Sequence, residues 1–234
     1  MASSRPRTIG LLGGMSWESS ILYEEIINTE TRRRLGGSHS ADLIIRSYDF
    51  AAVEELQATG DWDAAGAMLA RDAVRLVAAG AECVLLCTNT MHRVAPAVEA
   101  AIEVPFLHLA DTTAAAVCRA GVERVALLGT RFTMELDFYR GRLEASGLEV
   151  LVPDAAGRSV VHDVIYQELV RGIVRPESKR AYLDVIERLV DAGATGVIAG
   201  CTEIELLVGP EDVPVDYFAT TRLHALAAVE WSLG

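Results

Sequence analysis

The chain has 234 residues, of which 51% are hydrophobic and 23% are charged, the balance of an ordinary globular protein. Its formal net charge of −12 argues against nucleic acid as a partner, because phosphate binding requires a basic face. No apolar run reaches the ~18 residues needed to span a bilayer, and residues 1–7 are too short and polar for a signal peptide. We therefore expect a cytoplasmic protein that does not bind membranes.

Strand patterns and helix patterns alternate along the first half of the chain. Short apolar runs predict strands at residues 8–12, 43–47, 83–87 and 106–109. Helices are predicted at residues 17–34, 61–79, 94–102 and 112–120. This alternation is typical of an α/β fold with parallel sheets.

The second half of the chain repeats the first. Three segments recur in the same order: RTIGLLGG (7–14) as RVALLGT (124–130), AGAECVLLCTNT (79–90) as AGATGVIAGCTE (192–203), and VPFLHLADTTAAAV (104–117) as VPVDYFATTRLHALAAV (213–229). We therefore predict two lobes related by a pseudo-twofold axis, each a parallel sheet flanked by helices, with the active site in the cleft between them. The expected N-terminal lobe is 1–110 plus 217–234, and the expected C-terminal lobe is 111–216.

Polar residues follow the predicted strands, where ligands bind in parallel sheets. The repeat aligns Thr88 with Cys201, each at the end of an apolar run. Free amides and the helix dipole at strand-to-helix turns favour negative charge. A carboxylate is therefore expected to bind Asn89, Thr90, Thr130 and Thr202.

One protic group in each lobe suits racemisation, which removes a proton from one face of a carbon and delivers another to the opposite face. Cys201 is the predicted acid/base group of one lobe, and Thr88 is the matching group of the other. The thiolate is the base, and a helix N-terminus lowers the pKa of a cysteine. The remaining barrier must be lowered by hydrogen bonds to the enediolate that forms when Cα loses its proton.

The other three cysteines are weaker candidates for the site. Cys83 and Cys118 are predicted to be inert core thiols. Cys87 stays open as a site residue because it directly precedes Thr88, although strand alternation points the two side chains to opposite sides. The repeat also pairs Cys87 with Gly200, which favours a packing role. The four cysteines show no CxxC spacing and no metal-type cluster, so no metal site is expected.

Histidines and glycines near the strand ends give weaker signals. His92 lies four residues after Thr88, so it either reaches back to that turn or is a half-buried helix residue. His108 and His224 carry no further signal. The Gly13–Gly14 pair lacks the GxGxxG pattern and an acidic ribose partner, so no nucleotide cofactor is expected.

Three segments carry a family resemblance: IGLLGGMSWESS (9–20), TNTMH (88–92) and GCTEI (200–204). The chain resembles the aspartate/glutamate racemase family, which works without pyridoxal phosphate, over nearly its whole length. It is most similar to the bacterial L-aspartate/glutamate-specific branch, which has Thr at the first catalytic position. The resemblance implies paired α/β lobes, a homodimer, no cofactor and a small acidic amino acid as substrate.

The resemblance also implies roles for individual residues. Thr88 and Cys201 would be the catalytic pair. The implied substrate contacts are Met15, Gln57, Asn89, Thr90, Thr202 and Glu203. A cation for the substrate's side-chain carboxylate is expected, with Arg46 and Arg171 as candidates.

The chain departs from the family's usual CNT motif, which has Cys where this sequence has Thr88. A threonine hydroxyl is a far poorer base than a thiol at neutral pH, so we expect one enantiomer to be preferred as substrate. Two alternatives stay open. One is a one-thiol decarboxylase or isomerase of small dicarboxylic acids, and the other is a catalytically silent binding protein for acidic metabolites.

Overall fold

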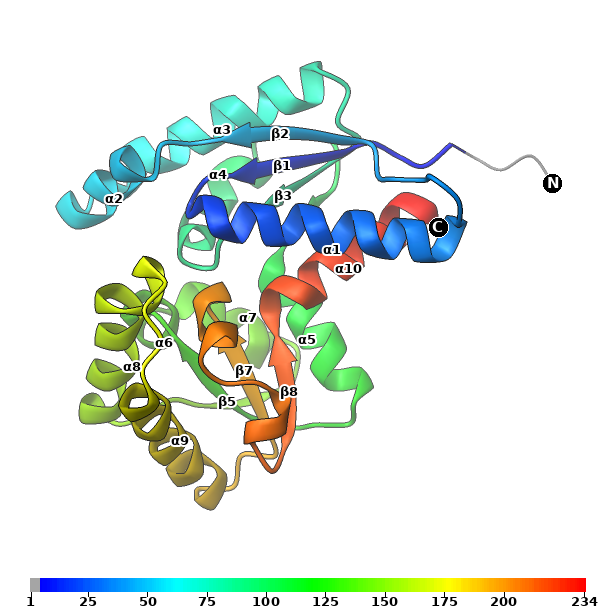
Figure 1. Ribbon diagram of the computed structural model, residues 1–234. Helices are drawn as coiled ribbons and strands as arrows, with labels where there is room; N and C mark the ends of the chain where they lie inside the picture. The colour runs from blue at the N-terminus through cyan, green and yellow to red at the C-terminus, as the bar shows by residue number, and fades with distance from the viewer. Residues whose placement is uncertain (1–4) are drawn as a thin grey trace. The chain divides into compact units, whose positions relative to one another are not determined.

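The computed structural model describes residues 5–234, and the chain divides into two compact units. Unit 1 takes the chain up to Leu109 and adds His224–Gly234, and unit 2 is Ala110–Leu223. Each unit contains a four-stranded parallel sheet flanked by helices, which confirms the predicted α/β fold (Figure 1). Within the described part of the chain, no helix is both long enough and apolar enough to cross a membrane.

The sheet of unit 1 has the strand order β2-β1-β3-β4. Its strands are β1 (Ile9–Gly13), β2 (Leu43–Ser47), β3 (Cys83–Leu86) and β4 (Phe106–Leu107). The helical segments are α1 (Trp17–Leu35), α2 (Phe50–Thr59), α3 (Trp62–Ala78), the 3-10 helix η1 (Thr90–Val94), α4 (Ala95–Glu99) and the C-terminal part of α10 (Thr220–Leu233).

The central strands β1 and β3 of the unit 1 sheet are buried on both faces, which explains their apolar sequences. Leu12 and Leu86 pack with residues of α2 and α3 on one face. Leu11 and Leu85 point the other way and pack with residues of α1 and α10. Figure 1 shows α3 on one side of this sheet and α1 and α10 on the other.

Unit 2 has the strand order β6-β5-β7-β8. Its strands are β5 (Arg124–Gly129), β6 (Glu149–Leu151), β7 (Gly196–Gly200) and β8 (Asp216–Ala219). Its helical segments are α5 (Leu109–Arg119), α6 (Arg131–Glu135), α7 (Asp137–Ala145), α8 (Ala155–Gln167), α9 (Pro176–Asp191) and the 3-10 helices η2 (Leu169–Arg171), η3 (Thr202–Leu206) and η4 (Pro210–Asp212).

Helices α8 and α9 cover one face of the unit 2 sheet, where Leu128 and Val197 pack with Val161 of α8 and Val185 of α9 (Figure 1). Counted along the chain, the strand order within each unit is second, first, third, fourth, and all pairs are parallel. The predicted duplication is therefore present in the topology of the two sheets.

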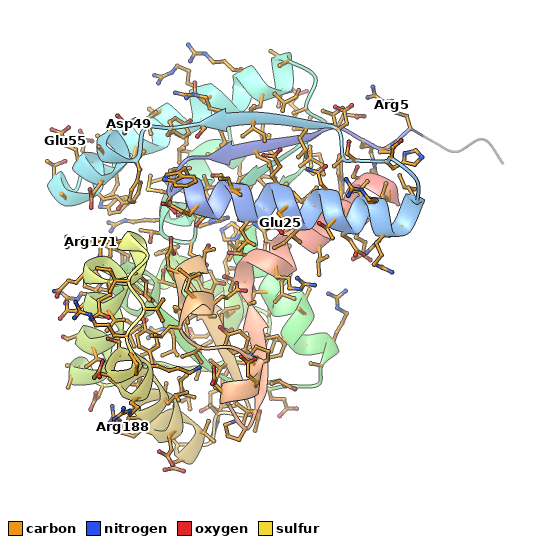
Figure 2. The ribbon with its side chains drawn as sticks, in the orientation of Figure 1. Arg5, Glu25, Asp49, Glu55, Arg171 and Arg188 are labelled. Carbon is orange, nitrogen blue, oxygen red and sulfur yellow. The ribbon has the colours of Figure 1, made fainter. Side chains whose placement is uncertain are left out.

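The structure differs most from the predicted elements at two places. The helix predicted at 94–102 begins earlier, as η1, and ends with the five-residue α4. Helix α2 was not predicted, because it buries only Val53 and Gln57 and so has little apolar periodicity. Its ends are nevertheless well defined. The side chain of Asp49, labelled in Figure 2, accepts a hydrogen bond from Ala51 N, and Gly60 closes the helix with φ of 72°.

Candidate active site

The predicted catalytic residues occupy matching positions after the central strands of the two sheets. In unit 2, β5 and β7 end with Gly129 paired to Gly200, and Cys201 follows directly. In unit 1, Leu12 of β1 pairs with Leu86 of β3, so the next step along both strands brings Cys87 beside Gly13. Thr88 then follows Cys87 as Cys201 follows Gly200. The register inferred from the sequence repeat therefore agrees with the strand pairing.

The turn after β1 needs its glycines for packing. Gly14 has φ of 82°, and a Cβ at this position would clash with the main-chain N and O of Tyr48. The Gly14 amide also donates a hydrogen bond of 2.6 Å to Ser20 Oγ at the start of α1. The glycine pair thus lets this turn approach the end of β2 closely, and it places the buried Met15 at the carboxyl edge of the sheet.

Unit 1 gathers most of its predicted substrate contacts around η1. Asn89 and Thr90 are 5% and 6% exposed where the chain leaves β3. Gln57 reaches η1 from α2, and its Nε2 donates to the sulfur of Met91 at 3.1 Å. Met15 belongs to the same buried cluster as Met91. The unpredicted helix α2 is therefore the element that positions Gln57.

His92 supports the turn that carries Thr88. Its Nδ1 lies 2.7 Å from the Thr88 carbonyl oxygen, and its Nε2 accepts a hydrogen bond of 3.2 Å from Leu109 N. Because Nε2 accepts, the ring hydrogen lies on Nδ1, which donates to Thr88. The side chain is 1% exposed. Of the two predicted roles for His92, the structure shows the one that reaches back to the turn.

Two further histidines lie beside His92, and no sequence pattern connects the three. The His108 ring centroid lies 4.5 Å from that of His92, and the His224 centroid lies 5.9 Å away. Nε2 of His224 donates to Leu107 O at 2.7 Å, and Nδ1 accepts from Tyr23 Oη at 2.7 Å. Burial lowers the pKa of His224 to about 4. Three buried imidazoles therefore lie side by side in unit 1.

Unit 2 brings its predicted residues together at the ends of β5 and β7. Thr130 caps α6, where its Oγ1 accepts from Thr133 N at 3.4 Å. Thr202 begins η3, and its Oγ1 lies 2.8 Å from Thr221 Oγ1. Cys201 lies between these turns and is 9% exposed. The second sheet therefore presents a thiol and threonine hydroxyl groups at the ends of two adjacent strands.

The Cys201 thiol has a direct partner. Its Sγ donates a hydrogen bond of 2.9 Å to Glu203 Oε2. Burial and the neighbouring Glu203 carboxylate raise the pKa of Cys201 well above its usual range. The nearby backbone amides of Thr202 and Glu203 lower the pKa, but they do not outweigh this effect. The expectation that a helix N-terminus lowers this pKa is therefore wrong for the protein without substrate.

The lengths of the following helices explain part of that error. The segments after Thr88 and Cys201 are the 3-10 helices η1 and η3, each of five residues. A macrodipole sums over aligned peptide units, so such short segments supply little of the field that a long α-helix would provide. Individual amide and hydroxyl groups remain as the donors for a bound carboxylate.

The two candidate cations differ in their surroundings. Arg46 Nε lies 3.2 Å from Oδ2 of the buried Asp72, its Nη1 donates to Ser47 O, and its guanidinium stacks on Tyr48 at 4.4 Å. Arg171, labelled in Figure 2, is exposed at the end of η2, which packs against η3. Within residues 5–234, the Arg171 guanidinium has no hydrogen-bond or ion-pair partner.

The other three cysteines are two buried thiols and one exposed thiol. Like Cys201, they are free of disulfide bonds. Cys83 and Cys87 are fully buried, and burial raises the pKa of Cys83 to about 12. Cys118 is exposed, with its Sγ 3.9 Å from Ser146 O. The prediction that Cys118 lies in the core is therefore wrong, because this position of α5 faces solvent. No group of three His, Cys, Asp or Glu residues within 5–234 is arranged to hold a metal ion.

Known proteins are similar to this chain in sequence and fold. The family model for Asp/Glu/hydantoin racemases matches residues 12–228. A crystal structure from Yersinia pestis, provisionally assigned as an Asp/Glu racemase, is 49% identical and superposes with a TM-score of 0.93, covering 97% of this chain and 100% of that one. The crystal structure of an aspartate racemase homologue from Pyrococcus horikoshii OT3 is 32% identical, with a TM-score of 0.85 and coverage of 97% and 99%.

A relative that is named as a racemase has a lower sequence identity. The broad specificity amino-acid racemase RacX of Bacillus subtilis (strain 168) is 22% identical over 204 residues, which are 86% of this chain and 87% of that protein. The match of the family model over residues 12–228 decides the assignment. This chain belongs to the Asp/Glu/hydantoin racemase family.

Proposed function

We propose that this protein is a cofactor-independent racemase of an acidic amino acid, aspartate or glutamate. The observation that carries the proposal is the matching position of Thr88 and Cys201 after the central strands of two sheets with the same topology. In the proposed reaction, these two side chains serve opposite faces of one Cα. Family membership supports racemisation as the type of chemistry.

Cys201 and Thr88 differ in their strength as bases, and this difference decides which enantiomer reacts faster. Cys201, as a thiolate, removes the Cα proton of the preferred enantiomer. The Thr88 hydroxyl delivers a proton to the opposite face and regains one from solvent water. A threonine hydroxyl is a poor base near neutral pH, so removal from its own face is slow. One enantiomer is therefore the better substrate, and L is the expected one from the resemblance to the L-specific branch.

Substrate recognition needs an anion site in addition to the catalytic pair. We propose that Arg171 binds the side-chain carboxylate, because its guanidinium lacks a partner within residues 5–234 and η2 packs against η3. Arg46 is a poorer candidate, since it already pairs with Asp72. The proposed contacts for the rest of the substrate are Met15, Gln57, Asn89, Thr90, Thr130, Thr202 and Glu203. Arginine suits a carboxylate because its planar donors can bind both oxygens.

The experiment follows the Cα proton directly. The protein is incubated in D₂O with L-aspartate, D-aspartate, L-glutamate and D-glutamate, and the Cα signal is followed by NMR while chiral chromatography measures inversion. Exchange with inversion supports the racemase. Cys201→Ala should abolish exchange, and Cys118→Ala is the matched control, since that thiol is exposed on α5.

Other outcomes identify the alternatives. Exchange without inversion would point to a one-thiol enzyme, such as a decarboxylase or isomerase of dicarboxylic acids, which Thr88 in place of a second thiol would suit. Binding without exchange would indicate a silent acidic-metabolite binding protein. Either result would overturn the racemase proposal. The proposed homodimer is tested separately by light scattering coupled to size-exclusion chromatography.

A further inference from the structure

The contact between Cys201 and Glu203 joins a nucleophile to a base within one turn. Sγ and Oε2 lie 2.9 Å apart, and the thiol is the donor because an ionised carboxylate can only accept. Cys201 is 9% exposed, so the bond is largely shielded from water. A thiol proton in this arrangement lies on the direct line to a carboxylate oxygen.

The same turn is built to stabilise the sulfur after the proton leaves. The nearby backbone amides of Thr202 and Glu203 lower the pKa of the thiol and so favour its ionised form. Burial and the carboxylate charge oppose ionisation in the resting protein. Moving the proton to Glu203 removes that charge while the two amides stay in place. The resting thiol and the active thiolate thus each have a stabilising partner.

Other titratable groups around the sulfur have different partners. Tyr182 of α9 is fully buried near Cys201, but its Oη donates to Val161 O at 2.8 Å. Glu168, at the start of η2, accepts from Ser178 Oγ at 2.6 Å and pairs with Arg175 at 3.4 Å. Glu203 is therefore the carboxylate in unit 2 with a direct hydrogen bond to the thiol.

We propose that Glu203 is the immediate proton acceptor of Cys201 and generates the catalytic thiolate. This inference rests on the proposed function and assigns Glu203 a catalytic role beyond that of a substrate contact. In the first step, the Sγ–H bond breaks, an O–H bond forms at Oε2, and the electron pair stays on sulfur. The charge of the pair stays at −1.

The following steps balance the protons. The thiolate takes the Cα proton, and the electrons of the Cα–H bond pass into the enediolate. Thr88 protonates the opposite face, and the proton held by Glu203 returns through solvent water to the Thr88 oxygen. The pair is then again a thiol and a carboxylate, ready for another turnover.

A carboxylate that only accepts a hydrogen bond from the thiol would behave differently from one that takes its proton. Glu203→Gln removes the negative charge and the proton acceptor, but it keeps the size of the side chain. Loss of the charge should raise the thiolate fraction, whereas loss of the acceptor should slow catalysis. The proposal therefore predicts that two readouts move in opposite directions.

The first readout is alkylation of Cys201 by iodoacetamide across a pH series, measured in a Cys118→Ser background so that the exposed thiol does not react. Cys201→Ala supplies the blank. Glu203→Gln should speed alkylation at pH 7 by roughly tenfold, the change for one pKa unit. Glu205→Gln, a matched change on the same η3 turn, should leave the alkylation profile unchanged.

The second readout is Cα exchange in D₂O at saturating substrate. Glu203→Gln should lower kcat by roughly 10²-fold or more, as expected for loss of an acid/base group. Glu203→Asp keeps a carboxylate and should restore part of that kcat. A rise in KM with unchanged kcat would show a substrate contact only and would overturn the proposal. Unchanged alkylation would overturn it too, even if the wild-type protein exchanged none of the four amino acids.

Discussion

The imidazole of His92 joins two main-chain segments of unit 1, donating from Nδ1 to the Thr88 carbonyl and accepting at Nε2 from Leu109 N. Both bonds are buried, and they link the turn after β3 to the start of α5. The position of the Thr88 side chain therefore depends on a residue four positions later. His92 acts through the backbone of Thr88 and is a positioning residue.

Replacement of His92 should affect both stability and catalysis. His92→Ala leaves a buried carbonyl and a buried amide without this partner, and each such group costs ~1–3 kcal/mol. We expect the free energy of unfolding in urea to fall by about 2 kcal/mol or more, and inversion of the substrate to slow. His39→Ala, on an exposed loop, should change stability by less than ~0.5 kcal/mol. Equal effects of the two variants would contradict this role.

Replacing each of the two candidate cations should have a different effect on the steady-state kinetics. Arg171→Ala should raise KM for the acidic substrate by roughly 10–100-fold, the loss expected for one charge-assisted hydrogen bond of ~1.5–3 kcal/mol. Arg46→Ala should leave KM nearly unchanged and lower the free energy of unfolding, since it removes a partner of the buried Asp72. The reverse pattern would assign the carboxylate to Arg46.

The buried His224 predicts a loss of stability in mild acid. Its pKa is lowered to about 4 in the folded protein from an ordinary value of 6.5, so the unfolded chain binds more protons between these pH values. Stability should therefore rise with pH through this window, and His224 alone should cost ~2 kcal/mol between pH 7 and pH 5.

Urea unfolding at several pH values measures this cost. His224→Gln should be less stable than wild type at pH 7, because the contacts with Tyr23 and Leu107 change. Its stability should nevertheless fall less between pH 7 and pH 5, by about the same ~2 kcal/mol. Parallel pH curves for the two proteins would show that His224 does not titrate as described.

A thiol at position 88 should make the two faces more alike. Thr88→Cys replaces a weak base by a strong one, so removal of the proton from the slow enantiomer should rise by ~10-fold or more. The preference for one enantiomer should weaken in proportion. Thr88→Ser keeps a hydroxyl and should retain the wild-type preference. An unchanged ratio of the two directions in Thr88→Cys would remove this residue from the proposed catalytic pair.

Much of the fold could be read from the sequence because it depends on local pattern. Buried parallel strands need continuous apolar runs, and β3 (Cys83–Leu86), which is buried throughout, lies within the run predicted at 83–87. The repeated segments predicted two similar sheets, and the strand pairing at Leu86 and Gly200 agrees with their alignment. Helix α2 was not predicted, because most of its residues are not buried and its sequence shows little apolar periodicity.

The partners of the site residues could not be read in this way. Gln57 meets Met91 from a helix 34 positions earlier, and His224 meets Tyr23 across 201 positions. Sequence spacing carries no information about such contacts. Even the short-range contact from Cys201 to Glu203 lies in the 3-10 turn η3, whereas the sequence analysis expected only a helix N-terminus that lowers the pKa of the thiol.

By itself, the amino-acid sequence determined the α/β class, the duplicated sheets and the strand ends at Thr88 and Cys201, since apolar periodicity and repetition are local properties. Only the tertiary structure decided that the Cys201 thiol is paired with a carboxylate, that Arg46 is occupied by Asp72, and that His92 supports Thr88. The physical reason is that protonation and charge pairing depend on distance and burial, and these are set when the chain packs.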